Sequence, residues 1–377
     1  MENRLFFNRD RFIKQLTEMI AVESETGDEG RMTEYLQKWF TDRGYETIRD
    51  NAGSTCGSTG DNIIVHIPGT MPGEAICFNA HQDTVIPGKG IRPHLEGDRL
   101  VSAGDTILGA DDKSGIAILM EALLSIEENR IPHREMYYLF TIGEEVGQTG
   151  AHALDPAMLP CRSIMSIDDA GHPDHIDRLG IGIRIIKGVF HGKPAHASLD
   201  IESGISAIQM IADAVAAMPV GKKDGGVAVN IGKINGGGPA GVVPDHAEFT
   251  GSVYGFDNET MTACIEQLRD ICMNSAAKFG GSVEFFSEER IPVYRQDQDW
   301  FIFKCCYDAY MKEGIKPEVT ICYGAGDANI FNAKGYQCGG ISSGMYNCHT
   351  SGEYLDLNET ALSYRILMRM MTDGFEA

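Results

Sequence analysis

Residues 78–87 read FNAHQDTVIP and follow directly on a short apolar run at residues 75–77. An apolar run of this kind predicts a buried strand, so the polar side chains come where the strand ends. His81 and Asp83 stand two positions apart, and residues i and i+2 of an extended chain point to the same side. The imidazole and the carboxylate can therefore converge on one point. Taken alone, the pair is explained more simply as a strand end that happens to be polar.

Polar residues follow apolar runs at four more places in the chain. All of them are of types that bind metal ions, and they are Asp111 with Asp112, Glu144 with Glu145, Asp168 with Asp169, and His349 with Glu353. A solvated loop explains each of these places taken singly. Five such placements in one chain, all of His, Asp and Glu, indicate a shared site.

Short apolar runs alternate with segments of helical spacing along much of the chain. The runs that we expect to form strands are residues 62–67, 75–79, 136–142 and 163–167. Residues 115–126 have the pattern of a helix. Strands that alternate with helices predict an α/β fold whose sheet has parallel character. In such sheets ligands bind beyond the carboxyl ends of the strands, where His81 stands.

Length and charge limit the classes of function. A chain of 377 residues is long enough for two domains. The net charge of −22 would repel a polyanion, so we expect neither nucleic acid nor a membrane surface as a partner. The first 20 residues contain no signal-peptide pattern, and no apolar run could span a membrane. For these two reasons we expect a cytoplasmic protein. Ten cysteines without a CxxC pair fit reduced, mostly buried thiols better than a disulfide framework.

The residue types at the strand ends also indicate the chemistry. Histidines and carboxylates without cysteine suit Zn²⁺ or a neighbouring first-row ion of hydrolytic enzymes. Two such ions about 3.5–4 Å apart need a bridging anion, and a carboxylate can provide it. In the adjacent pair Glu144 and Glu145, one carboxylate can bind a metal ion while the other takes a proton from metal-bound water, whose pKa is lowered to about 7.

The motifs AHQDTV, GADDKSG, TIGEEVG, IDDAG and CHTSGEY resemble, in order and context, those of the di-zinc metallopeptidases that include peptidase T, aminoacylase-1 and glutamate carboxypeptidase. The forms GADDKSG and YNCHTSGEY are most similar to the peptidase T branch. Residues 187–208 and 229–257 resemble the lid, or dimerisation, domain of that family. The resemblance extends over essentially the whole chain.

This resemblance implies a discontinuous catalytic domain with an insertion. The catalytic domain would contain residues 1–182 and 292–377, with a mixed sheet flanked by helices. An α+β lid domain, through which two copies form a homodimer, would occupy residues 183–291. The long interval without a further ligand-type strand end between Asp168 and His349 agrees with such an insertion.

The resemblance also implies which residues bind the metal ions. His81 and Asp168 would bind one ion, Glu145 and His349 would bind the second, and Asp111 would bridge the two. The peptide bond that follows Asp111 is expected to be cis. The implied cofactor is a pair of divalent ions, namely Zn²⁺, with Co²⁺ or Mn²⁺ as alternatives.

Three further residues receive catalytic roles from the resemblance. Glu144 would be the general base, and Asp83 would orient His81 through the ring nitrogen that does not bind metal. His196 would be supplied by the lid of one subunit to the active site of its partner, where it would stabilise the oxyanion.

The expected function is a peptidase that hydrolyses the N-terminal peptide bond of short peptides. Tyr254 departs from the family pattern, which often has an arginine there for the substrate carboxylate. Gly326 stands where a hydroxyl residue is usual, and Gly241 stands where many members have asparagine. These departures leave open an N-acyl amino acid amidohydrolase or a carboxypeptidase of the same family, and also a non-catalytic homologue that binds metal.

Overall fold

The computed structural model describes residues 6–222 and 226–373, which form two compact units. Unit 1 contains the described residues up to Arg178, Arg295–Cys322, and the described residues from Gly326 onward. Unit 2 contains the described part of Leu179–Tyr294 together with Tyr323–Ala325. The narrower insertion that we expected, residues 183–291, stays a prediction.

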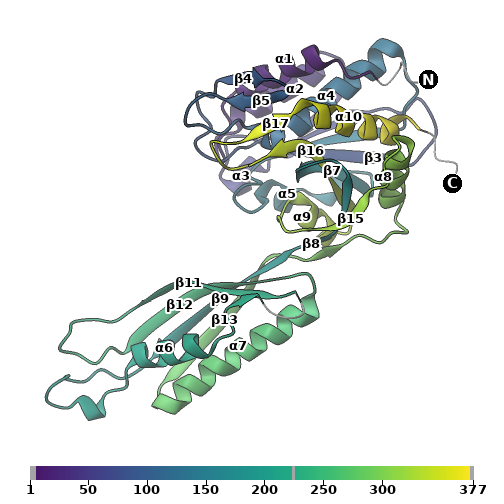
Figure 1. The fold of residues 1–377 in the computed structure, drawn as a ribbon. Helices are drawn as coiled ribbons and strands as arrows, with labels where there is room; N and C mark the ends of the chain where they lie inside the picture. Colours follow the sequence, from purple (N-terminus) through teal and green to yellow (C-terminus); the bar gives the residue numbers. More distant parts are fainter. Residues whose placement is uncertain (1–5, 223–225, 374–377) are drawn as a thin grey trace. The chain divides into compact units, whose positions relative to one another are not determined.

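Unit 1 is built on a nine-stranded mixed sheet with the strand order β1-β2-β6-β3-β7-β16-β17-β5-β4. The strands are β1 (Glu46–Arg49), β2 (Ile63–Ile67), β3 (Ile76–His81), β4 (Pro93–Glu96), β5 (Arg99–Ser102), β6 (Met136–Thr141), β7 (Ser163–Ala170), β16 (Gln337–Tyr346) and β17 (Tyr354–Asp356). The four central strands, β6-β3-β7-β16, run parallel, and the outer strands pair antiparallel. The expected α/β fold with a mixed sheet is confirmed (Figure 1).

Helices cover the sheet of unit 1. They are α1 (Arg9–Ile20), α2 (Gly30–Thr41), α3 (Gly53–Cys56), α4 (Ala110–Asn129), α5 (Thr149–Ala153), α8 (Phe301–Lys312), α9 (Asp327–Ala333) and α10 (Leu357–Thr372). Helix α4 is buried almost all round, which agrees with its apolar residues on every face. It packs against β3, α1 and α10. At the carboxyl end of β3, the backbone N–H of His81 donates to the carboxylate of Asp112 in the first turn of α4.

Aromatic packing joins α2 to the same sheet. The ring of Phe40 lies 5.6 Å from that of Phe140 and 6.1 Å from that of Tyr138, and all three side chains are fully buried.

A smaller sheet has the strand order β14-β8-β15. Its strands are β14 (Tyr294–Arg295), β8 (His175–Gly180) and β15 (Glu318–Cys322).

Unit 2 is an α+β domain with its own core. Its antiparallel sheet has the order β10-β11-β12-β9-β13, and the strands are β9 (Gly182–His191), β10 (Gly221–Lys222), β11 (Ala228–Gly236), β12 (His246–Gly255) and β13 (Ser282–Ile291). Helices α6 (Ala207–Ala217) and α7 (Asn258–Phe279) pack on one face of this sheet (Figure 1). Phe190, Phe249 and Leu268 belong to a hydrophobic cluster separate from that of unit 1.

Two expectations about the whole chain can be compared with the structure. None of the ten cysteines forms a disulfide, which agrees with the expectation of reduced thiols. Across residues 6–222 and 226–373, none of the helices combines the length and apolar character needed to cross a bilayer.

The C-terminal end of α10 is held by a buried arginine, Arg134, which is 1% exposed. Its guanidinium donates hydrogen bonds to the carbonyl oxygens of Met370 (2.7 Å), Glu74 (3.0 Å) and Asp373 (2.9 Å). The last carbonyl groups of a helix have no intrahelical partner, and a cation next to them is favourable. Arg134 therefore connects α10 to the segment that leads into β3.

We expect Arg134→Met to destabilise the protein by about 3 kcal/mol, because it leaves buried carbonyl groups without these donors. Chemical denaturation followed by circular dichroism would measure the change. The exposed Arg162 gives a matched control, and Arg162→Met should change stability by less than about 0.5 kcal/mol. Equal effects of the two substitutions would contradict this account of Arg134.

Candidate metal centre

The metal-binding candidates of the sequence lie together at the carboxyl edge of the parallel strands. His81 is the last residue of β3, and Asp168 lies near the end of β7. Asp111 stands in the first turn of α4, and Glu145 follows β6 after a turn at Gly143. Gly143 has φ +60°, and a Cβ there would lie 2.1 Å from the hydroxyl of Thr149, so the turn requires glycine.

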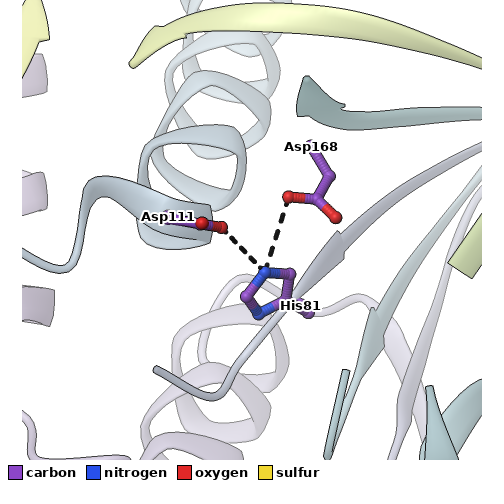
Figure 2. A group of neighbouring side chains, drawn as sticks. All are labelled: His81, Asp111 and Asp168. Carbon is purple, nitrogen blue, oxygen red and sulfur yellow. Dashed lines mark hydrogen bonds and ion pairs between the residues drawn. The ribbon is translucent and has the colours of Figure 1, made fainter. Parts of the chain in front are cut away.

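His81, Asp111 and Asp168 form a first donor set (Figure 2). The Nε2 atom of His81 lies 3.0 Å from Oδ1 of Asp111 and 3.5 Å from Oδ1 of Asp168. Both carboxylates point toward this nitrogen from opposite elements, the start of α4 and the end of β7. One imidazole and two carboxylates within this range could hold a divalent ion.

Asp111, Glu145 and His349 form a second donor set. The Nε2 atom of His349 lies 2.9 Å from Oε2 of Glu145 and 3.2 Å from Oδ2 of Asp111. Asp111 therefore directs one oxygen to each histidine and is shared by the two sets. This is the arrangement that a carboxylate bridging two ions requires. The peptide bond between Asp111 and Asp112 is cis, as expected.

The charge of the cluster fits a cation. The carboxylates of Asp111, Glu144, Glu145 and Asp168 converge here, and among the described residues no lysine or arginine forms an ion pair with them. Burial, reinforced by the charge of Asp111, raises the pKa of Asp168 to about 7. Hydrogen bonds to Asp111 and Glu145 raise the pKa of His349 to about 10. Without metal ions, the raised pKa values favour protons on Asp168 and His349. Divalent cations at the same positions would also be stabilised by the surrounding negative charge.

The same field acts on the other histidine of the site. Burial lowers the pKa of His81, but the charge of Asp168 and the hydrogen bond to Asp111 raise it by more, so its pKa lies well above the ordinary value. The donor types and this unbalanced negative charge agree with a site for divalent ions.

Glu144 lies beside the two sets and is 6% exposed. Its ligand atoms come within 4.8 Å of those of His81 and Glu145. Burial, and then the charge of Asp168, raise the pKa of Glu144 well above its ordinary value. The side chain of Gln148 donates to its Oε1 at 2.7 Å and so fixes its orientation.

Gly326 lies against the same carboxylates. A Cβ at this position would be 3.5 Å from Oδ2 of Asp168 and 3.8 Å from Oε1 of Glu144. The residue that departs from the family pattern at this point therefore borders the centre itself.

Asp83 is fully buried and holds the loop that carries the two glutamates. Its carboxylate accepts hydrogen bonds from the backbone N–H groups of Glu144 (3.0 Å) and Glu145 (3.2 Å). The carboxylate lies 3.4 Å from Nδ1 of His81, whereas the backbone oxygen of Asp83 lies closer to that nitrogen, at 2.9 Å. Asp83 thus contacts His81 through both its backbone and its side chain, and its carboxylate also holds the loop of the two glutamates.

Three further buried carboxylates near the centre accept hydrogen bonds from backbone N–H groups. The sequence pattern indicates no role for any of them. Asp112 accepts from His81 (3.2 Å), and Glu29 accepts from Gly143 (3.1 Å). Glu353 accepts hydrogen bonds from the backbone N–H groups of Asp111 (3.0 Å), Gly109 and Leu108. Asp112 and Glu353 stood out as polar residues after apolar runs, but Glu29 lies in the polar stretch SETGDEG, where nothing distinguishes it.

The remaining predicted residues lie in unit 2. His196 is exposed, on the connection between β9 and α6, and its Nδ1 lies 3.3 Å from the backbone nitrogen of Ser198. Tyr254 lies in β12, opposite Ala228 of β11. Their expected roles stay predictions.

Comparison with known proteins places these features in a family. The model "Peptidase dimerisation domain", of the M20 type, matches residues 180–279, and the model "Peptidase family M28" matches residues 62–182. Over 367 residues the chain is 29% identical to the protein YqjE of Bacillus subtilis (strain 168), with 97% of this chain and 99% of the relative covered.

Two solved structures match over nearly the whole length. The aminopeptidase PepT of Bacillus cereus ATCC 10987 is 31% identical, with a TM-score of 0.92 and coverage of 97% of this chain and 98% of that chain. A tripeptidase of Staphylococcus aureus subsp. aureus Mu50 is 26% identical, with a TM-score of 0.91 and the same coverage. With its donor sets at the sheet edge, the chain therefore belongs to the M20 family of metal-dependent peptidases, in which it is similar to peptidase T.

Proposed function

We propose that the protein is a dinuclear zinc aminopeptidase that removes the first residue from short peptides. The observation that carries this proposal is the position of Asp111, whose two carboxylate oxygens face the two histidines separately. The similarity to an aminopeptidase and to a tripeptidase supports the choice of reaction and of substrate.

In this proposal His81 and Asp168 would hold one ion, Glu145 and His349 would hold the other, and Asp111 would be shared by both. Imidazole and carboxylate donors without a thiolate suit Zn²⁺, and Co²⁺ or Mn²⁺ can use the same donors. When bound, the ions would polarise the carbonyl group of the scissile bond and make a water molecule more acidic.

Glu144 acts as the general base in this proposal. Gln148 occupies Oε1 of Glu144, which leaves Oε2 to take a proton from the attacking water and to pass it to the leaving amine. The carboxylate of Asp83 accepts a hydrogen bond from the backbone N–H of Glu144, and this contact keeps the base next to the metal centre.

Recognition of the amino end is supported by a residue of unit 2. Tyr254 stands where the family pattern often has an arginine, and a phenol cannot replace the charge with which a guanidinium binds a carboxylate. A substrate whose carboxyl end need not be charged is consistent with this substitution.

A homodimer formed through unit 2 completes the proposal. The dimerisation model matches residues 180–279, which contain His196. In a dimer, His196 of one subunit would donate a hydrogen bond to the oxyanion in the site of the other.

The direction of cleavage is tested with one tripeptide offered free, N-acetylated and C-amidated to zinc-loaded protein. We expect mass spectrometry to find loss of the first residue from the free and amidated forms and no cleavage of the acetylated form. Cleavage of the acetylated form alone, or loss of the last residue, would instead identify an amidohydrolase or a carboxypeptidase. Protein stripped of metal by a chelator serves as the control.

Glu144→Gln should lower kcat by about 10²- to 10⁴-fold, because the amide cannot accept the proton of the attacking water. Elemental analysis should find the same metal content as in the wild type. The exposed Glu34 of α2 provides the control Glu34→Gln, which should leave both quantities unchanged. Unchanged hydrolysis by Glu144→Gln at full metal content would refute its role as the base.

His196→Ala should lower kcat by about 10²- to 10³-fold with little change in metal content, because an oxyanion donor is lost. Co-expression with Glu144→Gln should restore part of the activity, since mixed dimers then contain one complete site. The control His191→Ala changes a histidine in the same unit that pairs with Glu284 and should keep its activity. Absence of restoration in isolated mixed dimers would show that His196 does not act on the partner's site.

A further inference from the structure

Glu353 belongs to neither donor set, and the residue is only 2% exposed. Its carboxylate lies at the start of α4. Its Oε2 accepts hydrogen bonds from the backbone N–H groups of Leu108 (2.7 Å) and Gly109 (2.8 Å). Its Oε1 accepts from the backbone N–H of Asp111 at 3.0 Å. One side chain therefore holds the whole segment that leads into the shared ligand.

The N-cap residue of the helix that follows has no side chain with which to order this segment. The first N–H groups of a helix have no intrahelical partner, and Gly109, at the N-cap, has no side chain to supply one. Asp111 (φ −77°, ψ 106°) and Asp112 (φ −114°, ψ 29°) are not helical, although they lie within α4. The position of the Asp111 carboxylate thus depends on contacts from elsewhere in the chain.

Two of these contacts come from one short segment, in which Glu353 stands 242 positions after Asp111 in the sequence. A third comes from His81, whose Nε2 lies 3.0 Å from Oδ1 of Asp111. Four residues before Glu353, His349 approaches the side chain of Asp111, with Nε2 3.2 Å from Oδ2. Residues 349–353 therefore contact Asp111 twice, at its carboxylate through an imidazole and at its backbone through a carboxylate.

We propose that Glu353 is the positioning residue of the bridging ligand. By fixing the backbone of Asp111, it keeps one carboxylate oxygen toward each donor set and so raises the affinity of the centre for both ions. The inference rests on the proposed dinuclear centre and goes beyond it, since Glu353 would contact neither the ions nor the substrate.

Glu353→Gln separates this role from simple capping of α4. A glutamine keeps one acceptor oxygen, but its amide N–H₂ must face at least one of the backbone N–H donors. The hydrogen bonds made by one of the two carboxylate oxygens are therefore lost. The matched control is Glu121→Gln. Glu121 lies on α4 itself, is buried like Glu353, and likewise accepts hydrogen bonds, from Arg11 and from the backbone N–H of Asn8. Both substitutions should lower the melting temperature of the metal-free protein.

Only Glu353→Gln should change metal binding. Titration of the metal-free proteins with Zn²⁺ against a chromophoric chelator should show affinity about 10- to 100-fold weaker than in the wild type. The visible spectrum of the Co²⁺-loaded protein should change in this variant and not in Glu121→Gln. Glu353→Asp keeps the charge with a shorter reach and should give an intermediate affinity, which also serves the test if Glu353→Gln fails to fold.

Two results would overturn the inference in distinguishable ways. If the wild type binds two ions and Glu353→Gln binds them with the same affinity and the same Co²⁺ spectrum, the positioning role is wrong and the dinuclear centre stands. If the wild type itself binds a single ion, the dinuclear centre falls and the inference with it. No peptide enters these measurements, so they do not depend on the direction of cleavage.

Discussion

The structure of unit 1 is organised around the mutual repulsion of carboxylates at the edge of its sheet. Asp111, Glu144, Glu145 and Asp168 converge within a few ångströms, and bringing charges out of water costs several kcal/mol for each ion that lacks compensation. Two histidines provide part of the compensation, and divalent ions would provide the rest. The fold must hold like charges together before such ions arrive.

Four more buried carboxylates, which surround the inner residues, hold the inner residues in place. Asp83, Asp112, Glu29 and Glu353 are buried, and each accepts hydrogen bonds from backbone N–H groups of the segments that carry the inner residues. A backbone N–H is a fixed partial positive charge that cannot move to solvent as a lysine can. The outer carboxylates thus lock loops whose side chains would otherwise separate.

Much of the fold could be predicted because apolar runs report buried parallel strands directly. The runs at residues 75–79 and 136–142 correspond to β3 and β6 within two residues at each end. Strand β7 extends to Ala170, beyond the expected end at residue 167, because it pairs with β16, where Ser342 lies opposite Asp169. Helix α4 begins before residue 115, at Ala110. The polar residues of its first turn are buried at the metal centre. In both elements the buried segment continues through polar residues, which in the sequence resemble the end of an element.

The candidate site divides in the same way. Its inner residues stand next to apolar runs, so their types and positions could be recognised. The role of the outer carboxylates could not be predicted, although Asp83, Asp112 and Glu353 stand after apolar runs. Glu29 and Glu353, for example, act through contacts 114 and 242 positions apart in the chain, with backbone groups that have no signature in the sequence. In unit 2, Phe190 and Phe249 belong to a separate core, but that core says nothing about what His196 contacts.

The position of β16 between β7 and β17 has a consequence for synthesis on the ribosome. Residues 81, 111 and 168 emerge early, so the elements that carry the first donor set can begin to fold while the chain is still growing. Strand β7 then remains an edge strand with unpaired backbone groups until residues 337–346 emerge, after the whole of the inserted sequence of unit 2. An edge of this kind can pair with other chains, so nascent protein has a period of aggregation risk that ends when β16 adds to β7. Because His349 and Glu353 follow β16 directly, closure of that edge and completion of the second donor set are one event.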